Sequence, residues 1–302
     1  MGSTSIAEAM KLNRLLIFLS LLVVVGIALY LSRDRCISIS SAPESLRVMS
    51  FNVGDCNWIF PSAEKISRII IEAGPPEILL LQEVRGEKQI GQLLHILKYP
   101  YHAAIPYKRQ ERAYLAIFSK YPLEQVEHMY FQSSREGSGA LSGIVRFGGC
   151  TVFICSVHLD QIPSKRRLKN GYIDQTVEHT ANQLKTEIFD DTIRSLSTNE
   201  LITWIQGKGH HSIIIGGDFN TIPFSKAVRT MNAAFNDALW PSKDYFTGTY
   251  FKIKSPLLPR VDYIFHSADL CVSNPEVIRK SPGDHYPVRA TFHIGVDTHV
   301  KN

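Results

Sequence analysis

Short apolar runs bounded by turn residues recur along the chain and predict β-strands separated by helices and hairpins. Runs of this length, rich in Ile, Val, Leu and Phe, are typical of strands. They lie at residues 47–52, 77–82, 114–119, 141–147, 150–157, 212–217, 261–265 and 288–292. Gly148-Gly149 separates two of them and indicates a hairpin. Hairpins mixed with strand–helix units imply mixed sheets that carry helices on their outer faces.

Two stretches carry helical signals. Ser62 can cap an amphipathic helix, which Gly74 and the two prolines after it would end. A longer helical region covers about residues 174–206. Within it, Ser197 and Glu200 have the spacing of a capping box, so we expect the region to split into two helices at that point.

Composition indicates a folded chain but does not by itself identify a function. The chain has 302 residues, 44% of them hydrophobic and 20% charged, which suits one large domain and excludes disorder throughout. The net charge of +5 is too small to argue for a nucleic-acid partner by itself. The five cysteines lack metal-ligand spacing and are too few for a disulfide scaffold.

Residues 15–31 form an apolar run that basic residues flank on both sides. Its length is at the short end for a membrane-spanning helix and at the long end for a signal-peptide core. A cleaved signal with its site near Ser38–Ser40 is one alternative, and a buried core helix is another. We expect an uncleaved signal-anchor, hence a single-pass membrane protein whose large domain lies outside the cytoplasm. The expected organisation is a tail at 1–14, the anchor at 15–31, a linker at 32–45, one domain at 46–296 and a tail at 297–302.

Polar residues with catalytic potential lie at or near the ends of the apolar runs, where folds assemble sites from distant parts of a sequence. They are Asn52, Glu83, His158, Asp218, Asn220, Asp262, Asp284 and His285. Asp218 and Asn220 are two residues apart, so on extended backbone they would point the same way. There a carboxylate can orient or deprotonate a water while an amide donates to a substrate oxygen. The alternative is an ordinary turn, because Asp and Asn are both turn residues.

Six short motifs make the chain resemble the endonuclease/exonuclease/phosphatase superfamily. In chain order they read F-N-V, L-Q-E-V, S-V-H-L, G-G-D-F-N, R-V-D-Y-I-F and D-H-Y-P-V, and they span residues 51–288. The resemblance implies the deoxyribonuclease I-like fold, an α/β (α+β) four-layer sandwich in which helices flank two packed mixed sheets. It also implies hydrolysis of a phosphate ester with Mg²⁺, or Mn²⁺ in its place.

The resemblance assigns roles residue by residue. Glu83 matches the main metal ligand, and Asn52 and Asp284 match its helpers. Asp218 matches the residue that activates the attacking water, and Asn220 matches a donor to a phosphate oxygen. His285 is similar to the histidine on the phosphate, with Asp262 as the carboxylate that holds it, and His158 is similar to the second phosphate-facing histidine. Gly283 and Tyr114-Leu115 depart from the family pattern, the latter in a substrate-side loop.

Basic and aromatic residues near these motifs are candidates for substrate binding. Arg166 and Arg167 belong to a basic run shortly after His158, and Arg112 belongs to a second basic group. Each group is either a solvated surface or a phosphate-binding loop. Trp58, Phe60 and Tyr107 could stack on bases or lie in an interface.

Three functions remain open from the sequence. The first is a membrane-anchored, metal-dependent phosphohydrolase acting on lipid-linked or other phosphates near the bilayer. The second is a nuclease outside the cytoplasm. The third is a catalytically inactive binding module, which the intact set of motifs disfavours. No protein partner is evident, and the sequence does not identify the leaving group.

Overall fold

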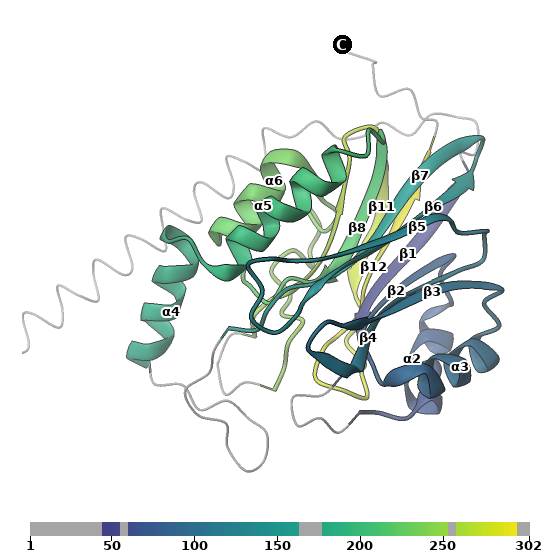
Figure 1. Cartoon of the computed structure of the whole chain (residues 1–302), viewed down its shortest axis with the longest axis horizontal. Helices are drawn as coiled ribbons and strands as arrows, with labels where there is room; N and C mark the ends of the chain where they lie inside the picture. Colours follow the sequence, from purple (N-terminus) through teal and green to yellow (C-terminus); the bar gives the residue numbers. More distant parts are fainter. Residues whose placement is uncertain (1–43, 55–59, 163–176, 253–257, 295–302) are drawn as a thin grey trace, which may run out of the picture. The chain divides into compact units, whose positions relative to one another are not determined.

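Two six-stranded β-sheets, each with helices on its outer face, form the part of the chain that the computed structural model describes (Figure 1). The described residues are 44–54, 60–162, 177–252 and 258–294. They belong to one unit that spans Ile39–Asn302. The predicted fold class is therefore confirmed.

Sheet A holds the strands from the N-terminal half together with the last two strands. Its order is β11 (Cys271–Val277), β12 (Val288–His293), β1 (Ser45–Asn52), β2 (Ile78–Val84), β4 (Gln110–Ser119) and β3 (Tyr101–Tyr107). The β1–β2 pair is parallel and the other pairs are antiparallel. Helices α2 (Ala63–Ala73) and α3 (Gly86–Leu97) pack on the outer face of sheet A, where Ile66 and Leu93 join a cluster with Met49 and Leu79.

Sheet B holds the central strands. Its order is β5 (Glu124–Tyr130), β6 (Gly139–Phe147), β7 (Cys150–His158), β8 (Ser212–Asp218), β10 (Asp262–His266) and β9 (Asn236–Asp237). The β7–β8 pair is parallel. Helices α5 (Ile193–Gln206) and α6 (Lys226–Ala234) cover its outer face through a cluster that includes Leu201 and Met231, and α4 (Val177–Phe189) precedes them.

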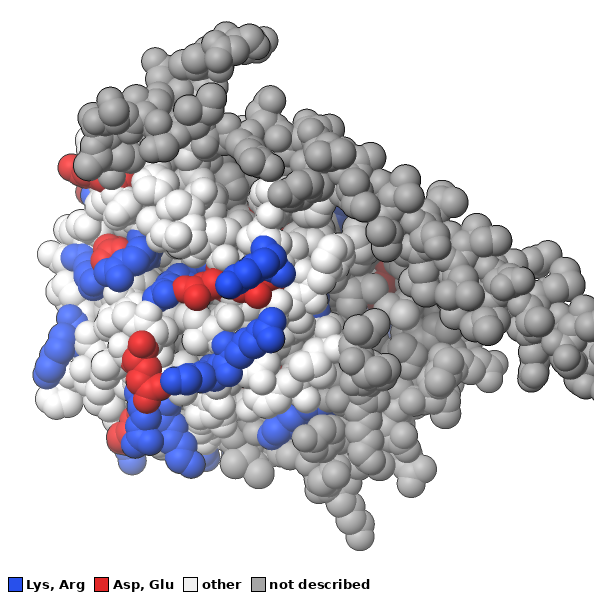
Figure 2. All heavy atoms as spheres, turned by 180° about the vertical axis from the view of Figure 1, so that it is seen from behind, with Lys and Arg blue, Asp and Glu red and all other residues white. Residues whose placement is uncertain are grey.

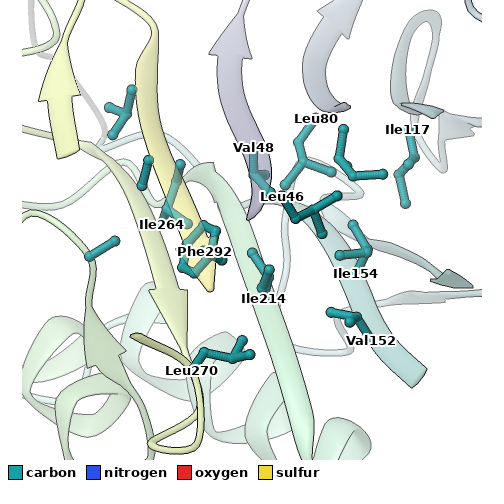
Figure 3. Close-up of a cluster of buried hydrophobic side chains, with 14 of the residues drawn as sticks. Leu46, Val48, Leu80, Ile117, Val152, Ile154, Ile214, Ile264, Leu270 and Phe292 are labelled. Carbon is teal, nitrogen blue, oxygen red and sulfur yellow. The ribbon is translucent and has the colours of Figure 1, made fainter. Parts of the chain in front are cut away.

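The core between the sheets takes alternate side chains from each strand. Val48 and Leu80 of sheet A meet Ile154, Ile214 and Ile264 of sheet B in one buried cluster (Figure 3). The residues beside them in sequence, such as those on either side of Ile214, face the helices instead. Because both faces are buried, the strands read as continuous apolar runs, and the sequence pattern therefore revealed them.

All eight predicted strands coincide with observed strands, and the predicted helix after Ser62 is α2. The predicted division of the long helical region is wrong. The chain breaks before Thr192, whose side chain accepts from Ser195 N while Ser195 Oγ accepts from Thr192 N. Glu200 instead lies inside α5, where its carboxylate accepts from the backbone N–H groups of Gln132 and Ser133. Glu200 is thus used for a tertiary contact and not for a cap.

No helix in the described ranges is long and apolar enough to cross a bilayer. A spanning helix needs about 20 mostly apolar residues, and the longest described helix, α5, has 14. This finding overturns the prediction of a single-pass membrane protein with its domain outside the cytoplasm. The predicted anchor at 15–31, the first tail, the last tail and most of the linker lie outside the described residues.

Charges on the described surface are mixed. Figure 2 shows acidic and basic side chains interspersed on one face. Opposite charges also pair directly, as Arg47 and Lys120 both do with Glu77. The modest positive net charge is therefore not gathered into one basic stripe on that face.

Candidate active site

Seven of the eight predicted residues come together where strands of both sheets end. Asn52 and Glu83 lie at the ends of the parallel neighbours β1 and β2, and His158 and Asp218 end the parallel neighbours β7 and β8. Asp262 begins β10. Their register places His158 opposite Asp218, and Asp218 opposite Asp262, so these three form a row across sheet B. The two remaining members, Asp284 and His285, precede β12.

Asn52 joins the two sheets at this edge. Its Nδ2 donates to Glu83 Oε1 at 3.2 Å and to Asp218 Oδ2 at 2.9 Å. Its Oδ1 accepts from Gly54 N at 3.0 Å. His158 Nε2 lies 3.6 Å from Glu83 Oε1 and 3.5 Å from Asp218 Oδ2. The carboxylates of Glu83, from sheet A, and Asp218, from sheet B, therefore both contact the Asn52 amide and the His158 imidazole.

His285 lies among three carboxylates. Its Nδ1 donates to Asp262 Oδ2 at 2.8 Å, while its Nε2 lies 3.7 Å from Asp218 Oδ2 and 3.9 Å from Asp284 Oδ1. Burial by itself lowers the pKa of His285, but Asp262 and Asp218 outweigh it and hold the pKa well above the usual value. The imidazolium form is therefore favoured, and its Nε2 side faces the centre of the site.

Asp218 is held ionised by its surroundings. Burial alone would raise the pKa of Asp218, but His285 and His158 outweigh it and lower that pKa. Asp218 Oδ1 also accepts from Asn220 N at 2.8 Å. A buried carboxylate that stays ionised can orient a water molecule and accept its proton.

Asn220, the eighth predicted residue, reaches the site through a turn, which was the alternative to extended backbone at this position. Its φ of 48° is left-handed, so the strand does not continue as extended backbone past Asp218. Its Nδ2 nevertheless lies 3.1 Å from His158 Nε2 and donates to Leu159 O at 2.8 Å. Asn220 therefore lies beside His158, because the chain turns sharply and brings it back.

Glu83 is held in an unusual conformation. Its φ is 57°, and the β2–β4 register shifts between Leu81 and Val84. Its backbone N–H donates to the hydroxyl of Tyr107 at 3.0 Å. Strained residues of this kind persist where the surroundings fix them, often at functional sites. This register shift explains why Glu83 leaves the regular alternation of β2.

At the site, Gly54 packs closely against Glu83, and Gly283 packs closely against the backbone of Gly54. A Cβ at Gly54 would lie 2.0 Å from Glu83 Oε2, and one at Gly283 would lie 2.2 Å from Gly54 O. In this backbone neither position accommodates a side chain. Gly283, where the sequence departs from the pattern of the family that it resembles, therefore fits the local geometry.

The residues present fit a hard divalent cation. Glu83, Asp218 and His158 offer ligand atoms within 4.8 Å of one another, and Asp218, Asp262 and His285 form a second such group. Burial raises the pKa of Glu83, and the charge of Asp284 raises it further, against the opposite effects of His158 and His285. A cation would relieve this crowding of carboxylates, and oxygen donors are those that Mg²⁺ prefers.

Of the predicted substrate-binding arginines, only Arg112 lies within the described residues. Arg112 is exposed on β4. Arg166, Arg167 and Trp58 lie outside the described residues. Phe60 is half-buried and has the Arg85 guanidinium over its ring at 5.4 Å.

Two residues have roles at the site that the sequence did not indicate, one of them Tyr107, which the sequence offered only as a base-stacking or interface residue. Tyr107 is buried, holds the Glu83 amide and packs its ring 5.2 Å from that of His158. Asp160 is also buried and accepts from the backbone N–H groups of Arg135 and Glu136, which fixes the loop beside His158. Asp160 was visible as the acidic residue directly after S-V-H-L, whereas nothing in the sequence pairs Tyr107 with Glu83.

Solved structures share this fold. The endonuclease/exonuclease/phosphatase from Bacteroides vulgatus has a TM-score of 0.61 at 16% identity, covering 83% of this chain and 99% of that chain. TDP2 of Caenorhabditis elegans, in truncated form, has a TM-score of 0.58 at 17% identity, covering 82% and 97%. The catalytic domain of human nocturnin with a bound sulfate anion has a TM-score of 0.58 at 19% identity, covering 82% and 94%. At such identities the likeness shows the fold alone.

Sequence comparison gives the family. A search of curated protein sequences found no match. The model of the endonuclease/exonuclease/phosphatase family, however, matches residues 49–285, which include all eight predicted site residues. That match covers more than half of the chain. The chain belongs to the endonuclease/exonuclease/phosphatase family.

Proposed function

We propose that this chain is a divalent-metal-dependent phosphoric ester hydrolase whose metal is Mg²⁺. The observation that carries the proposal is the crowding of acidic groups at one edge of the sandwich. Asp218, Asp262 and Asp284 are buried there, and Glu83 keeps only 14% of its side chain exposed. Burying several carboxylates together costs stability, so such a group favours a cation and catalysis over a structural role.

Glu83 is the main metal-holding residue in this proposal, with Asp284 beside it. Asn52 orients Glu83 and Asp218 through its Nδ2, and its Oδ1, which accepts from Gly54 N, keeps a second lone pair that can bind the metal. Bound Mg²⁺ would polarise a phosphoryl oxygen and offset the negative charge that develops on it. Mn²⁺ accepts the same oxygen donors.

The remaining residues prepare the water and the phosphate. Asp218, kept ionised by the two histidines, orients a water molecule and accepts its proton. His285, charged and fixed by Asp262, donates from Nε2 to a phosphate oxygen. Asn220 and His158 lie next to each other, with Nδ2 and Nε2 3.1 Å apart, so that an amide and an imidazole can contact the same phosphate group.

Phosphodiesters, including nucleic acids, are the substrate class that we favour. The family's description names endonucleases and exonucleases, which cleave the phosphodiesters of nucleic acids. An inactive binding module is disfavoured because the motifs and their geometry are intact.

Glu83→Gln tests the proposal, because it keeps the shape of the side chain and removes the charge. Glu87→Gln is a matched control, since Glu87 is exposed at the start of α3. The assay is hydrolysis of bis(4-nitrophenyl) phosphate and of short DNA strands by the full chain, with Mg²⁺ or with EDTA. We expect hydrolysis that EDTA and Glu83→Gln abolish and Glu87→Gln retains.

A second readout does not depend on turnover. Mg²⁺ at about 100 times its Kd should raise the free energy of unfolding by about 2.7 kcal/mol. The melting temperature of the wild-type chain should therefore rise with Mg²⁺, and that of Glu83→Gln should rise much less. Hydrolysis that persists in EDTA would remove the metal from the mechanism.

A further inference from the structure

Two phenylalanine rings from separate loops lie side by side on the surface. Phe224 is 38% exposed and Phe246 is 66% exposed, with ring centroids 6.2 Å apart and planes inclined by 36°. The buried ring of Tyr245 packs edge-on against Phe246, with their ring centroids 4.8 Å apart. Leaving a large apolar ring in water forgoes the stability that its burial would give the fold. Two adjacent exposed rings therefore need an explanation.

Phe224 is also held in a strained conformation. Its φ of 71° is left-handed, a region that bulky side chains rarely adopt. Arg229 fixes this conformation, because its guanidinium donates both to Phe224 O and to Ile188 O. Strain that the surroundings maintain is common at ligand-binding positions. Here it maintains an exposed ring.

The pair belongs to two loops that adjoin the proposed catalytic residues. Phe224 follows Asn220 by four residues in the loop after β8. Phe246 precedes Tyr250 by four residues, and Tyr250 forms an isolated β-bridge with His285 and places its ring 5.1 Å from the imidazole. A substrate longer than one phosphate could therefore extend from the site towards these rings.

Positive charge accompanies the rings. Arg229 and Lys243 are both exposed, and neither forms an ion pair within the described residues. Arg229 contacts the Phe224 carbonyl, and Lys243 lies three residues before Phe246. Aromatic rings accompanied by cations that have no acidic partner within the described residues complement a planar group that is linked to phosphates.

We propose that Phe224 and Phe246 form a subsite that stacks a nucleobase of a phosphodiester substrate, with Arg229 and Lys243 facing its phosphates. The subsite rests on the proposed function, since it lies beside the site of ester hydrolysis and names the substrate class. Stacking on an aromatic face needs no particular hydrogen-bond pattern, so the subsite accepts any base.

Two ligands with equal phosphate charge test the subsite. One is a single strand of four deoxythymidines, and the other is the same strand with tetrahydrofuran abasic residues. Binding is measured by calorimetry on the full chain with Mg²⁺, in an Asp218→Asn background that prevents turnover. We expect the base-containing strand to bind at least about tenfold more tightly, as stacking of one base allows.

Variants at the rings give the decisive comparison. Phe246→Ala and Phe246→Leu should both bring the two affinities together, because leucine keeps apolar surface and lacks a flat ring. Phe224→Ala should do the same. Tyr101→Ala, which removes a 40% exposed ring at the other end of β3 from Tyr107, should leave the preference intact.

Each contrary outcome has a definite meaning. Equal affinities for the two strands in the parent, or a preference that survives Phe246→Ala, would overturn the subsite. Retention of the preference in Phe246→Leu would also overturn it, in favour of apolar contact alone. Binding of dodecyl phosphate that depends on Phe246, without a base preference, would assign the rings to an alkyl chain. EDTA-sensitive hydrolysis by the wild type is scored separately, so the proposed function stands or fails independently of these results.

Discussion

The hydroxyl of Tyr107 accepts the backbone N–H of Glu83 at 3.0 Å, and the Tyr107 ring packs 5.2 Å from the ring of His158. Tyr107 is in β3 and Glu83 in β2, both of sheet A, whereas His158 ends β7 of sheet B. One buried side chain thus contacts two proposed catalytic residues from opposite sheets. The strained backbone of Glu83, with its φ of 57°, depends on such a partner.

Tyr107→Phe should weaken metal binding without unfolding the chain. The change removes only the oxygen that accepts the Glu83 amide, and an unsatisfied buried donor costs about 1–3 kcal/mol. If the backbone of Glu83 relaxes as a result, its carboxylate moves away from the other ligands. We expect Mg²⁺ or Mn²⁺ affinity, measured by calorimetry, to fall by about tenfold, with a matching fall in kcat/KM.

Tyr99→Phe is the matched control for this change. The Tyr99 hydroxyl is likewise buried and donates to a backbone oxygen, that of Pro76, at 2.8 Å. Both variants should lose stability, but only Tyr107→Phe should lose metal affinity. Equal metal affinity in Tyr107→Phe and the wild type would show that the hydroxyl serves stability alone.

The strands that the sequence predicted are those whose apolar side chains are buried. β8 is the clearest example, since Ile213, Ile214 and Ile215 alternate between the helix-facing cluster and the core between the sheets. The missed strands carry a weaker signal for a physical reason. β5 lies at a sheet edge with mostly exposed residues, and the edge strand β3 contains Pro106.

The site was predictable as a set of residues but not as a geometry. Polar residues that end apolar strands predicted which side chains would meet, because parallel neighbours end at one edge. The left-handed conformation of Glu83 could not be read from residue type, whereas asparagine, as at position 220, adopts this conformation more readily than most residues. Tyr107, which accepts from Glu83 N, and Leu159 O, which accepts from Asn220 Nδ2, are brought to these residues by tertiary packing.

Asp262→Asn should move the alkaline limb of the pH profile to lower pH. Burial lowers the pKa of His285, and Asp262 is foremost among the charges that raise it well above its usual value. Replacing Asp262 with an amide removes one such charge, so the imidazolium loses its proton at lower pH. The measurement is kcat/KM against pH for both proteins.

Asp269→Asn is the control for the pH profile, because Asp269 is exposed and accepts from the Ser212 hydroxyl away from the site. Its profile should match that of the wild type. An alkaline limb that stays in place in Asp262→Asn would show that the charge of His285 does not depend on this pairing.

Asp218→Asn should abolish turnover at every pH and retain most substrate binding. The amide cannot take the proton of a water molecule, whereas Asn220 and the histidines remain to contact the phosphate. In the wild type, activity should fall on the acid side as Asp218 is protonated, below the ordinary range for a carboxyl because its pKa is lowered. Single-turnover rates and calorimetric affinities separate the two effects. Substantial activity in the variant would reject the water-activating role.

Glu77 should make the stability of the fold depend on pH, far from the catalytic residues. Its carboxylate accepts from Arg47 N, Nε and Nη2 and from Lys120 Nζ, at 2.8 to 3.1 Å. Burial alone would raise the pKa of Glu77, but Arg47 and Lys120 outweigh it and lower the pKa from 4.5 to about 2. A lowered pKa in the folded state means that the ionised form stabilises the fold.

The sign of this effect fixes the experiment. The contribution of Glu77 is fully present above about pH 4.5 and is lost as the pH falls towards about 2. Glu77→Gln should therefore reduce the free energy of unfolding at pH 7 by about 1.5–3 kcal/mol, and the difference from the wild type should shrink as the pH falls through that window. Urea unfolding at a series of pH values measures both quantities, with the exposed Glu87→Gln as control. A difference between wild type and Glu77→Gln that stays constant from pH 7 to pH 2 would show that Glu77 contributes through its shape and not through its charge.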